Sequence, residues 1–149
     1  LLTPVVNLAK ESDIMLVVET GNNAMITSCF LGRKLIDDLD TKHLKVLWDP
    51  ANALYCGENP SKNALDSMEG GYLGHVHMKD VEVAIHQAKI KCVALGEGQM
   101  APHLQKISER LNQIGYDGSM SLESVYRPTE GNFEDGFNAS ITKFKNLYS

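Results

Sequence analysis

The sequence predicts an α/β fold in which helices flank a parallel sheet. Helical and strand-like segments alternate from one end of the chain to the other, as in a series of β-α-β units. The strand-like segments are short, continuous apolar runs, which is typical of parallel strands buried on both faces. With 149 residues, the chain has the length of one domain and can bury a core. The alternation alone does not decide between a barrel and an open, doubly wound sheet.

The expected strands share a simple pattern, an apolar run that is ended by a polar residue or a turn. Pro50 stops the second run, and the turn Gly96-Glu97-Gly98 closes the fourth. We expect five strands, at 14–19, 44–49, 72–78, 91–95 and 119–123.

The expected helices lie around these strands and carry apolar residues at helical spacing. The clearest one has Pro102 in its first turn and Gly115 as its C-terminal cap, with four apolar residues on one face. We expect helices at 4–11, 27–39, 60–68, 102–114 and 133–147.

Polar side chains with metal-ligand chemistry end four of the five strands. They are Glu19, Asp49, His77 and Glu123. Taken singly, each has a plainer interpretation: a loop ion pair, a helix cap, or a buried histidine with one backbone partner. Because the carboxyl ends of parallel strands lie at one edge of a sheet, we expect the four side chains to meet there. Together they predict one divalent-metal site.

The predicted ligand set of three carboxylates and one imidazole favours hard or borderline cations. We expect Mn²⁺, with Mg²⁺, Co²⁺ or Zn²⁺ as alternatives. Such an ion polarises a carbonyl or hydroxyl oxygen and stabilises an enediolate. A glutamate with a free oxygen can then move a proton at the neighbouring carbon.

Three further side chains are candidates for substrate binding. His75 lies on the same side of its strand as His77, because side chains alternate along a strand. Lys79 follows that strand and could offset negative charge on a substrate oxygen, while Asp80 could orient a neighbour. Arg127, beyond the last strand, could meet an anionic group. The plainer alternatives are a buried histidine, a solvated Lys79–Asp80 ion pair and a solvated arginine.

Composition excludes several functional classes. The net charge of −5 argues against sequence-independent binding of nucleic acid. No apolar run reaches the roughly 18 residues of a membrane span. Three scattered cysteines without a CxxC pair fit a reducing, cytoplasmic location.

Five segments, VVETGN, LWDPAN, GHVHMKD, LGEG and GYDGSMSLES, resemble the xylose isomerase-like TIM-barrel superfamily, and most of all its sugar phosphate isomerase/epimerase proteins. The resemblance implies one divalent metal held by the four strand-end residues. It also implies that Glu19 and Glu123 act as acid/base groups on opposite faces of a substrate. Asn52, a further candidate for substrate binding, stands where ketose 3-epimerase relatives have a histidine, and Val83 stands where they have an arginine. The sequence therefore departs from the 3-epimerase pattern.

The endonuclease IV branch of this superfamily binds three zinc ions. Its additional aspartate and histidine ligands correspond to Ile90 and Cys92 here, and its histidine after the metal aspartate is again Asn52. DNA repair is therefore not expected.

The resemblance extends over residues 1–149 but covers only the C-terminal part of the barrel, strands 4 to 8. A TIM barrel has about 250 residues and eight strands. We therefore expect a partial barrel of about five parallel strands with flanking helices. Its open edges would pair with the missing N-terminal part or with another copy of the chain.

The expected function is a metal-dependent sugar or sugar-phosphate isomerase or epimerase that transfers a proton through an enediolate. One alternative is an inosose-type dehydratase, which uses the same metal chemistry. Another is an inactive barrel fragment that serves as a binding or assembly module. The expected partner is a small sugar, free or phosphorylated, with no nucleic acid and no membrane.

Overall fold

The computed structural model describes residues 1–148 and confirms the alternating α/β order. Within these residues the helices are α1 (Thr3–Glu11), α2 (Cys29–Leu39), α3 (Pro50–Tyr55), α4 (Ala101–Gln113) and α5 (Phe133–Tyr148). The strands are β1 (Leu16–Glu19), β2 (Leu44–Trp48), β3 (Leu73–Met78), β4 (Asp80–Ala84), β5 (Lys89–Val93) and β6 (Met120–Leu122). Two single turns of 3-10 helix, η1 (Leu65–Met68) and η2 (Ile85–Gln87), complete the order.

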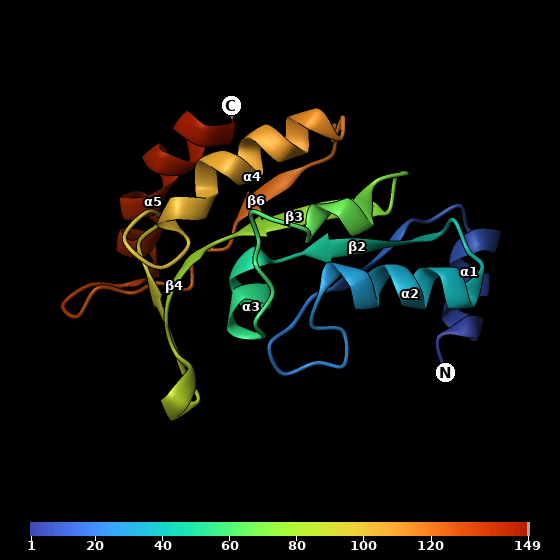
Figure 1. The fold of residues 1–149 in the computed structure, drawn as a ribbon, viewed down its shortest axis with the longest axis horizontal. Coiled ribbons are helices and arrows are strands. Elements are labelled where there is room, and N and C mark those ends of the chain that lie inside the picture. The colour runs from blue at the N-terminus through green and yellow to red at the C-terminus, as the bar shows by residue number, and fades with distance from the viewer. Residues whose placement is uncertain (149) are drawn as a thin grey trace.

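The main sheet has four parallel strands in the order β1-β2-β3-β6 (Figure 1). Val18 is the register partner of Val46, and Val76 is the partner of Met120. All four strands of the main sheet run in the same direction, because crossover connections join them. Helices form the connections from β1 to β2 and from β2 to β3, and the β4–β5 hairpin with α4 connects β3 to β6. The predicted fold class is therefore confirmed, and the polar residues at the strand ends share one edge of the sheet.

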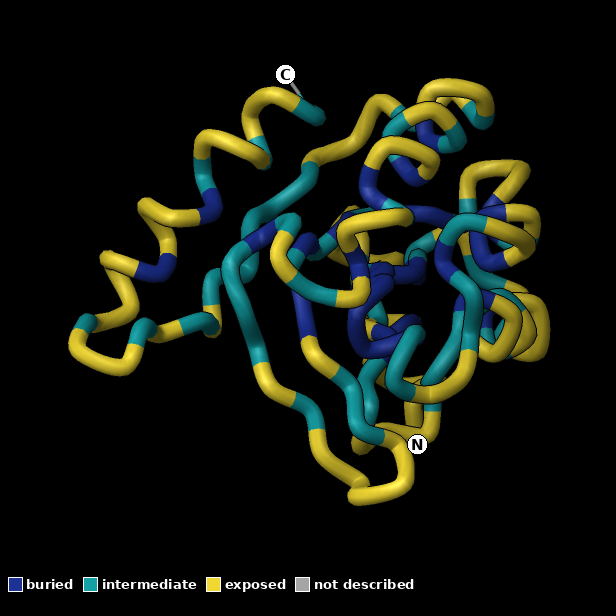
Figure 2. The backbone as a smooth tube through the Cα atoms, turned by 60° about the vertical axis from the view of Figure 1, so that its left-hand side comes forward, coloured by how far each residue is buried: buried dark blue, intermediate teal, exposed yellow. Residues whose placement is uncertain are grey.

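The hydrophobic core lies between the sheet and helices α2 and α4. Alternate residues of β2 and β3 point into it. The fully buried ones are Val46, Trp48, Val76 and Met78. Ile36 of α2 and Ile107 of α4 belong to the same core, in keeping with the apolar faces that the sequence predicted. The side chains between them in the strands therefore point to the other face of the sheet, where burial is only partial (Figure 2).

The prediction that residues 91–95 form the fourth strand of the parallel sheet is wrong. The segment Lys89–Val93 is β5, which pairs antiparallel with β4 in a separate two-stranded sheet. Apolar cross-strand pairs hold this hairpin together, with Val81 opposite Cys92 and Val83 opposite Ile90. Its tip, near Ala88, is exposed and projects from the body of the molecule (Figures 1 and 2). An apolar run of this length is compatible with a parallel or an antiparallel strand, so the sequence did not reveal that β4 is its pairing partner.

Two helical predictions also need correction. The segment 60–68 forms only the short turn η1, and Pro50 does more than stop β2, because it begins helix α3. Asp49 caps α3, since its side chain accepts hydrogen bonds from the first-turn backbone. The other predicted helices are confirmed to within about two residues at each end. In the part of the chain that the structure describes, no helix is both long and apolar enough to cross a bilayer.

Candidate metal centre

The four predicted ligands come together at the carboxyl edge of the sheet. Glu19 is the last residue of β1, Asp49 directly follows β2, His77 lies near the end of β3, and Glu123 directly follows β6. One potential ligand atom from each residue can be chosen so that all four lie within 4.8 Å of one another. Four strands that adjoin in space therefore place four ligand-type groups around one point.

Asp49 is the most rigidly held member of the cluster. Its side chain is fully buried, and its Oδ1 atom accepts hydrogen bonds of 3.0 Å from the backbone N–H groups of Ala51 and Asn52. Its own backbone N–H donates to the hydroxyl of Thr20 at 2.9 Å. The Asn52 amide nitrogen donates to Asp49 Oδ2 at 3.0 Å and to the carbonyl of Thr20 at 3.1 Å. The helix cap and the loop after β1 thus fix the carboxylate.

Lys79 connects two of the carboxylates. Its ammonium lies 2.6 Å from Asp49 Oδ2 and 2.7 Å from Glu123 Oε2. The lysine side chain is only 11% exposed, so this is a largely desolvated ion pair. Lys79 therefore belongs to the cluster itself, and the interpretation as a solvated pair with Asp80 does not hold.

The electrostatics of the cluster follow from burial and from this ammonium. Burial raises the pKa of Asp49 to about 6, although Lys79 opposes the shift. For Glu123, burial also favours the neutral acid, but the hydrogen bond and the charge of Lys79 outweigh it and lower the pKa. Burial disfavours the charged form of Lys79 itself, yet its two carboxylate partners raise its pKa. Glu123 is therefore ionised at neutral pH and can accept a proton.

His77 lies between the two glutamates. Its Nδ1 atom is 3.3 Å from Glu19 Oε1 and 3.7 Å from Glu123 Oε2. His75 packs edge-on against the His77 ring at a centroid distance of 5.2 Å, and its Nε2 lies 2.7 Å from the hydroxyl of Ser121. Burial and the neighbouring His77 lower the pKa of His75, so His75 is disposed to stay neutral.

Asp80 organises the loop beside the cluster. Its buried carboxylate accepts hydrogen bonds from four backbone N–H groups at 2.8 to 3.0 Å. The donors are Val81, Gly96, Gly98 and Met100. A side chain at Gly98 would collide with this carboxylate and with the carbonyl of Val81. This explains Gly98, because the backbone approaches the aspartate closely there, whereas Gly96 has a positive φ of 93° that favours glycine.

The cluster has the donor chemistry and the size for a divalent cation. Carboxylate and imidazole donors bind Mn²⁺, Mg²⁺, Co²⁺ or Zn²⁺ at about 2.0–2.4 Å, so ligand atoms on opposite sides of the ion are about 4–5 Å apart. The separation of up to 4.8 Å fits this requirement. The side chains of Glu19 and Glu123 are 43% and 32% exposed, so both remain accessible from solvent.

The predicted substrate-binding residues differ in where they lie. His75 and Lys79 border the four ligands, while Arg127 is exposed in the loop after β6. Asn52 is buried, and both hydrogens of its amide nitrogen are used within the protein, so only its amide oxygen is left for a substrate. Sequence reasoning missed Thr20 and Ser121, whose hydroxyls support Asp49 and His75. The available signal was the position of these hydroxyl residues near strand ends, since Thr20 directly follows Glu19 and Ser121 lies two residues before Glu123.

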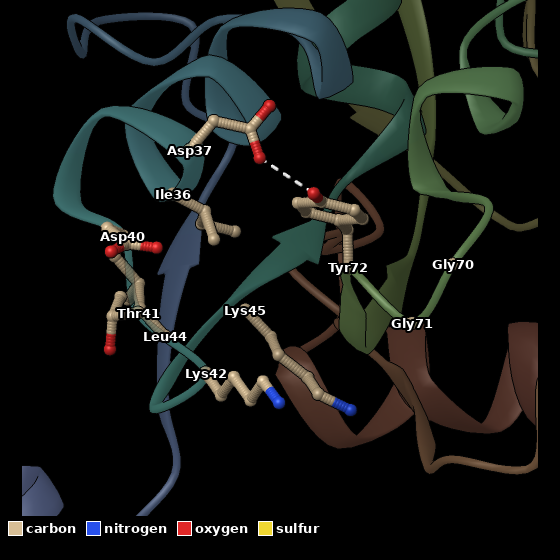
Figure 3. A pocket seen from close by; sticks show the side chains of 10 residues that line it. All are labelled: Ile36, Asp37, Asp40, Thr41, Lys42, Leu44, Lys45, Gly70, Gly71 and Tyr72. Atoms are coloured by element: carbon tan, nitrogen blue, oxygen red, sulfur yellow. Dashed lines mark hydrogen bonds between the residues drawn. The ribbon is translucent and has the colours of Figure 1, made fainter.

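A separate cavity lies away from the four clustered residues, at the opposite end of the strands (Figure 3). Its volume is about 560 Å³, and Tyr72 on its wall donates a 2.6 Å hydrogen bond to Asp37. Lys42 and Lys45 also line it. None of the four clustered ligands borders this cavity. Size alone therefore does not identify the functional site, and the cluster of titratable groups has the stronger chemical case.

Comparison with known proteins assigns the family. The family model described as a xylose isomerase-like TIM barrel matches residues 1–146. The chain belongs to the xylose isomerase-like TIM-barrel family. Among curated protein sequences, none matches the chain. The resemblance that the sequence motifs indicated is confirmed.

Solved structures place this family member among barrel proteins of about twice its length. A xylose isomerase domain protein from Planctomyces limnophilus is 23% identical with a TM-score of 0.75; 97% of this chain covers 49% of that one. For 3-keto-D-glucoside 4-epimerase from E. coli the identity is 21% and the TM-score is 0.75, and the match covers 97% of this chain and 51% of the epimerase chain. A probable 3-DHS dehydratase from Bacillus anthracis is 18% identical with a TM-score of 0.71, and the match covers 97% of this chain and 54% of the dehydratase chain. At these identities the similarity shows the fold.

Proposed function

We propose that this chain carries the acid/base and metal-binding site of a divalent-metal-dependent sugar or sugar-phosphate isomerase or epimerase. One observation carries the proposal: Glu19, Asp49, His77 and Glu123 converge at the carboxyl edge of the sheet with ligand atoms within 4.8 Å. Membership of the xylose isomerase-like family supports it, as does the similarity in fold to an enzyme named as a sugar epimerase.

In this proposal the two glutamates move the proton. Glu123, which is ionised at neutral pH, takes a proton from the carbon next to a sugar carbonyl. Glu19, in its protonated form, donates its own proton to the opposite face of the same carbon, and exchange with solvent then restores both carboxyl groups. The net result is inversion at that carbon, with no gain or loss of atoms. Return of the proton to the neighbouring carbon would instead give an isomerisation.

The remaining residues hold and polarise the substrate. Glu19, Asp49, His77 and Glu123 would hold the cation, and Mn²⁺ is the preferred candidate. When bound, the cation would supply positive charge that polarises the carbonyl and stabilises the enediolate. His75, Lys79, Asn52 and Arg127 are the proposed contacts to hydroxyl, oxyanion or phosphate groups. The rigid hold on Asp49 keeps one carboxylate in place, while the more exposed glutamates remain accessible from solvent.

Solvent exchange tests the proposal directly. The protein is incubated with Mn²⁺ and a panel of free and phosphorylated ketoses in deuterated water, and deuterium at the carbon next to the carbonyl is followed by NMR. We expect exchange in the wild type and a rate about 10²–10⁴-fold lower in Glu123→Gln.

A matched substitution controls this experiment. Glu97→Gln changes an exposed loop glutamate outside the cluster and should leave the exchange rate unchanged. Near-normal exchange in Glu123→Gln would reject its acid/base role. Failure of the wild type to bind Mn²⁺ in calorimetry would favour a catalytically inactive binding or assembly module.

A dehydratase is the second candidate, because one similar structure is named as a probable dehydratase. The same proton abstraction would then be followed by loss of a hydroxyl group from the next carbon. NMR of the products separates the two: an epimerase retains all oxygen atoms of the sugar, whereas a dehydratase releases one water per turnover.

A further inference from the structure

The hydrogen-bonding capacity of Asp49 is fully used within the protein. A carboxylate has two oxygens with about four lone-pair positions. Oδ1 accepts from the backbone N–H groups of Ala51 and Asn52, both at 3.0 Å. Oδ2 accepts from the Asn52 amide at 3.0 Å and from the Lys79 ammonium at 2.6 Å. Because the side chain is fully buried, it has no solvent-facing position to spare, and a cation needs one donor to leave.

The four donors differ in how readily they can leave. Two are backbone groups in the first turn of α3, fixed by the helix itself. The Asn52 amide is held from a second side, because it also donates to the Thr20 carbonyl at 3.1 Å. Lys79 alone sits on a flexible four-carbon stem, and among the four it alone carries a positive charge, which a divalent cation repels.

We infer that Lys79 competes with the divalent cation for this site, so that the cation binds Asp49 only in molecules whose Lys79 ammonium has left Oδ2. The inference rests on the proposed function, since it concerns the same centre. The competition involves a second ligand as well, because the ammonium also lies 2.7 Å from Glu123 Oε2. Without the cation, Lys79 offsets the repulsion between the two carboxylates and keeps them close.

This competition sets the affinity for the cation. The apparent dissociation constant equals the intrinsic one divided by the fraction of molecules in the competent state. An ammonium held by two carboxylates and only 11% exposed occupies its position in most molecules. If nine molecules in ten are blocked, removing the ammonium strengthens binding about tenfold. The displaced ammonium stays tethered at the end of β3, beside the open side of the cluster.

Calorimetric titration with Mn²⁺ tests the inference on the whole chain. Lys79→Met removes the charge and the donors but keeps the length of the side chain, and we expect it to bind Mn²⁺ at least about tenfold more tightly than the wild type. Lys79→Arg keeps a cation in place and should bind no more tightly than the wild type. The matched control Lys45→Met removes a lysine from β2 at the opposite end of the sheet and should change the affinity less than twofold.

A second measurement uses the wild type, because Lys79→Met leaves a buried carboxylate unpaired and could prevent folding. The methylene signals next to the Lys79 ammonium, assigned by comparison with Lys79→Arg, are followed by NMR during titration with diamagnetic Mg²⁺. We expect them to shift toward the positions of a solvated lysine as the site fills. Signals that stay unchanged at saturation would overturn the inference.

The outcomes separate this inference from the proposed function. Tighter Mn²⁺ binding by Lys79→Met supports the competition, even if no sugar is turned over and the proposed reaction fails. Equal or weaker binding by Lys79→Met overturns the competition while the reaction can stand. Absence of binding in both proteins overturns both.

Discussion

At the scale of single residues, Asp49 shows how one side chain meets two demands. The sequence left open whether this aspartate caps a helix or binds a metal, and the structure shows that it caps α3 while it also faces the other ligands. The two roles use different oxygens. Oδ1 accepts from the helix backbone, and Oδ2 faces Asn52 and Lys79. The cap occupies Oδ1 and removes the flexibility that an acidic side chain would otherwise have.

Asp80 supports a prediction about stability. In Asp80→Asn, an NH₂ group replaces one of the two carboxylate oxygens. Because an NH₂ group cannot accept hydrogen bonds from backbone N–H donors, about two of the four hydrogen bonds would be lost. We expect the free energy of unfolding to fall by about 3 kcal/mol, since buried hydrogen bonds to charged groups are worth about 1.5–3 kcal/mol each. Urea unfolding followed by circular dichroism measures this change.

The matched control is Asp38→Asn. Asp38 is exposed on α2 and pairs only with Lys34 at the next turn of the helix, so its loss should cost less than about 1 kcal/mol. Equal effects of the two substitutions would show that the hydrogen bonds of the buried Asp80 carboxylate do not stabilise the loop at residues 96–100.

The candidate site was more predictable than its surroundings. The convergence of the four candidate ligands could be predicted because parallel strands bring their carboxyl ends to one edge, so position along the chain implies position in space. The link between Lys79 and Asp49 could not be found in this way. It depends on the direction of a long side chain that leaves the end of β3 and crosses to β2, and sequence spacing carries no information on that direction.

At the scale of elements, strand pairing was the weak point of the sequence analysis. The runs 72–78 and 91–95 look alike as sequence, yet one joins the main parallel sheet and the other pairs with β4. The missed signal was the alternation in β4 and β5, with Glu82 opposite Lys91 and apolar pairs on either side. Helices were predicted better, because a helix shows its apolar face within its own sequence.

Gly136 in α5 gives a prediction at this scale. Alanine in a helix is favoured over glycine by about 1 kcal/mol, but a Cβ atom here would overlap the backbone carbonyl of Tyr126. Since a backbone group cannot rotate away, we expect overpacking to prevail and Gly136→Ala to lower the free energy of unfolding by about 1–2 kcal/mol. Urea unfolding measures the change.

Asn138→Ala is the control for this substitution, because Asn138 lies on the exposed face of the same helix. It should be neutral or slightly stabilising, as helix propensity alone predicts. If Gly136→Ala stabilised the protein to the same extent, α5 would not be packed closely on the segment around Tyr126.

At the scale of the whole molecule, a cluster of four candidate ligands lies on a sheet with two open edges. Within residues 1–148, β1 pairs only with β2, and β6 pairs only with β3. The chain spans about half the length of the similar solved structures. The ligands are nevertheless together, because all of them come from the four adjoining strands. The convergence of these four residues therefore depends only on strands within this sheet.

The open edge of β1 leads to the last prediction. Unpaired edge strands with exposed apolar side chains favour association, and Val17 in β1 is 43% exposed. We expect light scattering after size-exclusion chromatography to show a mass above that of one chain, 16.4 kDa. Val17→Glu places a charge on this edge, opposite Lys45 of β2, and should lower the mass toward that of the monomer.

Val5→Glu makes the same change on the surface of α1, where Val5 is 50% exposed, and should have no such effect. A monomeric wild type would show that the edge is protected without a partner, and equal effects of both substitutions would indicate general hydrophobic association instead of pairing through β1.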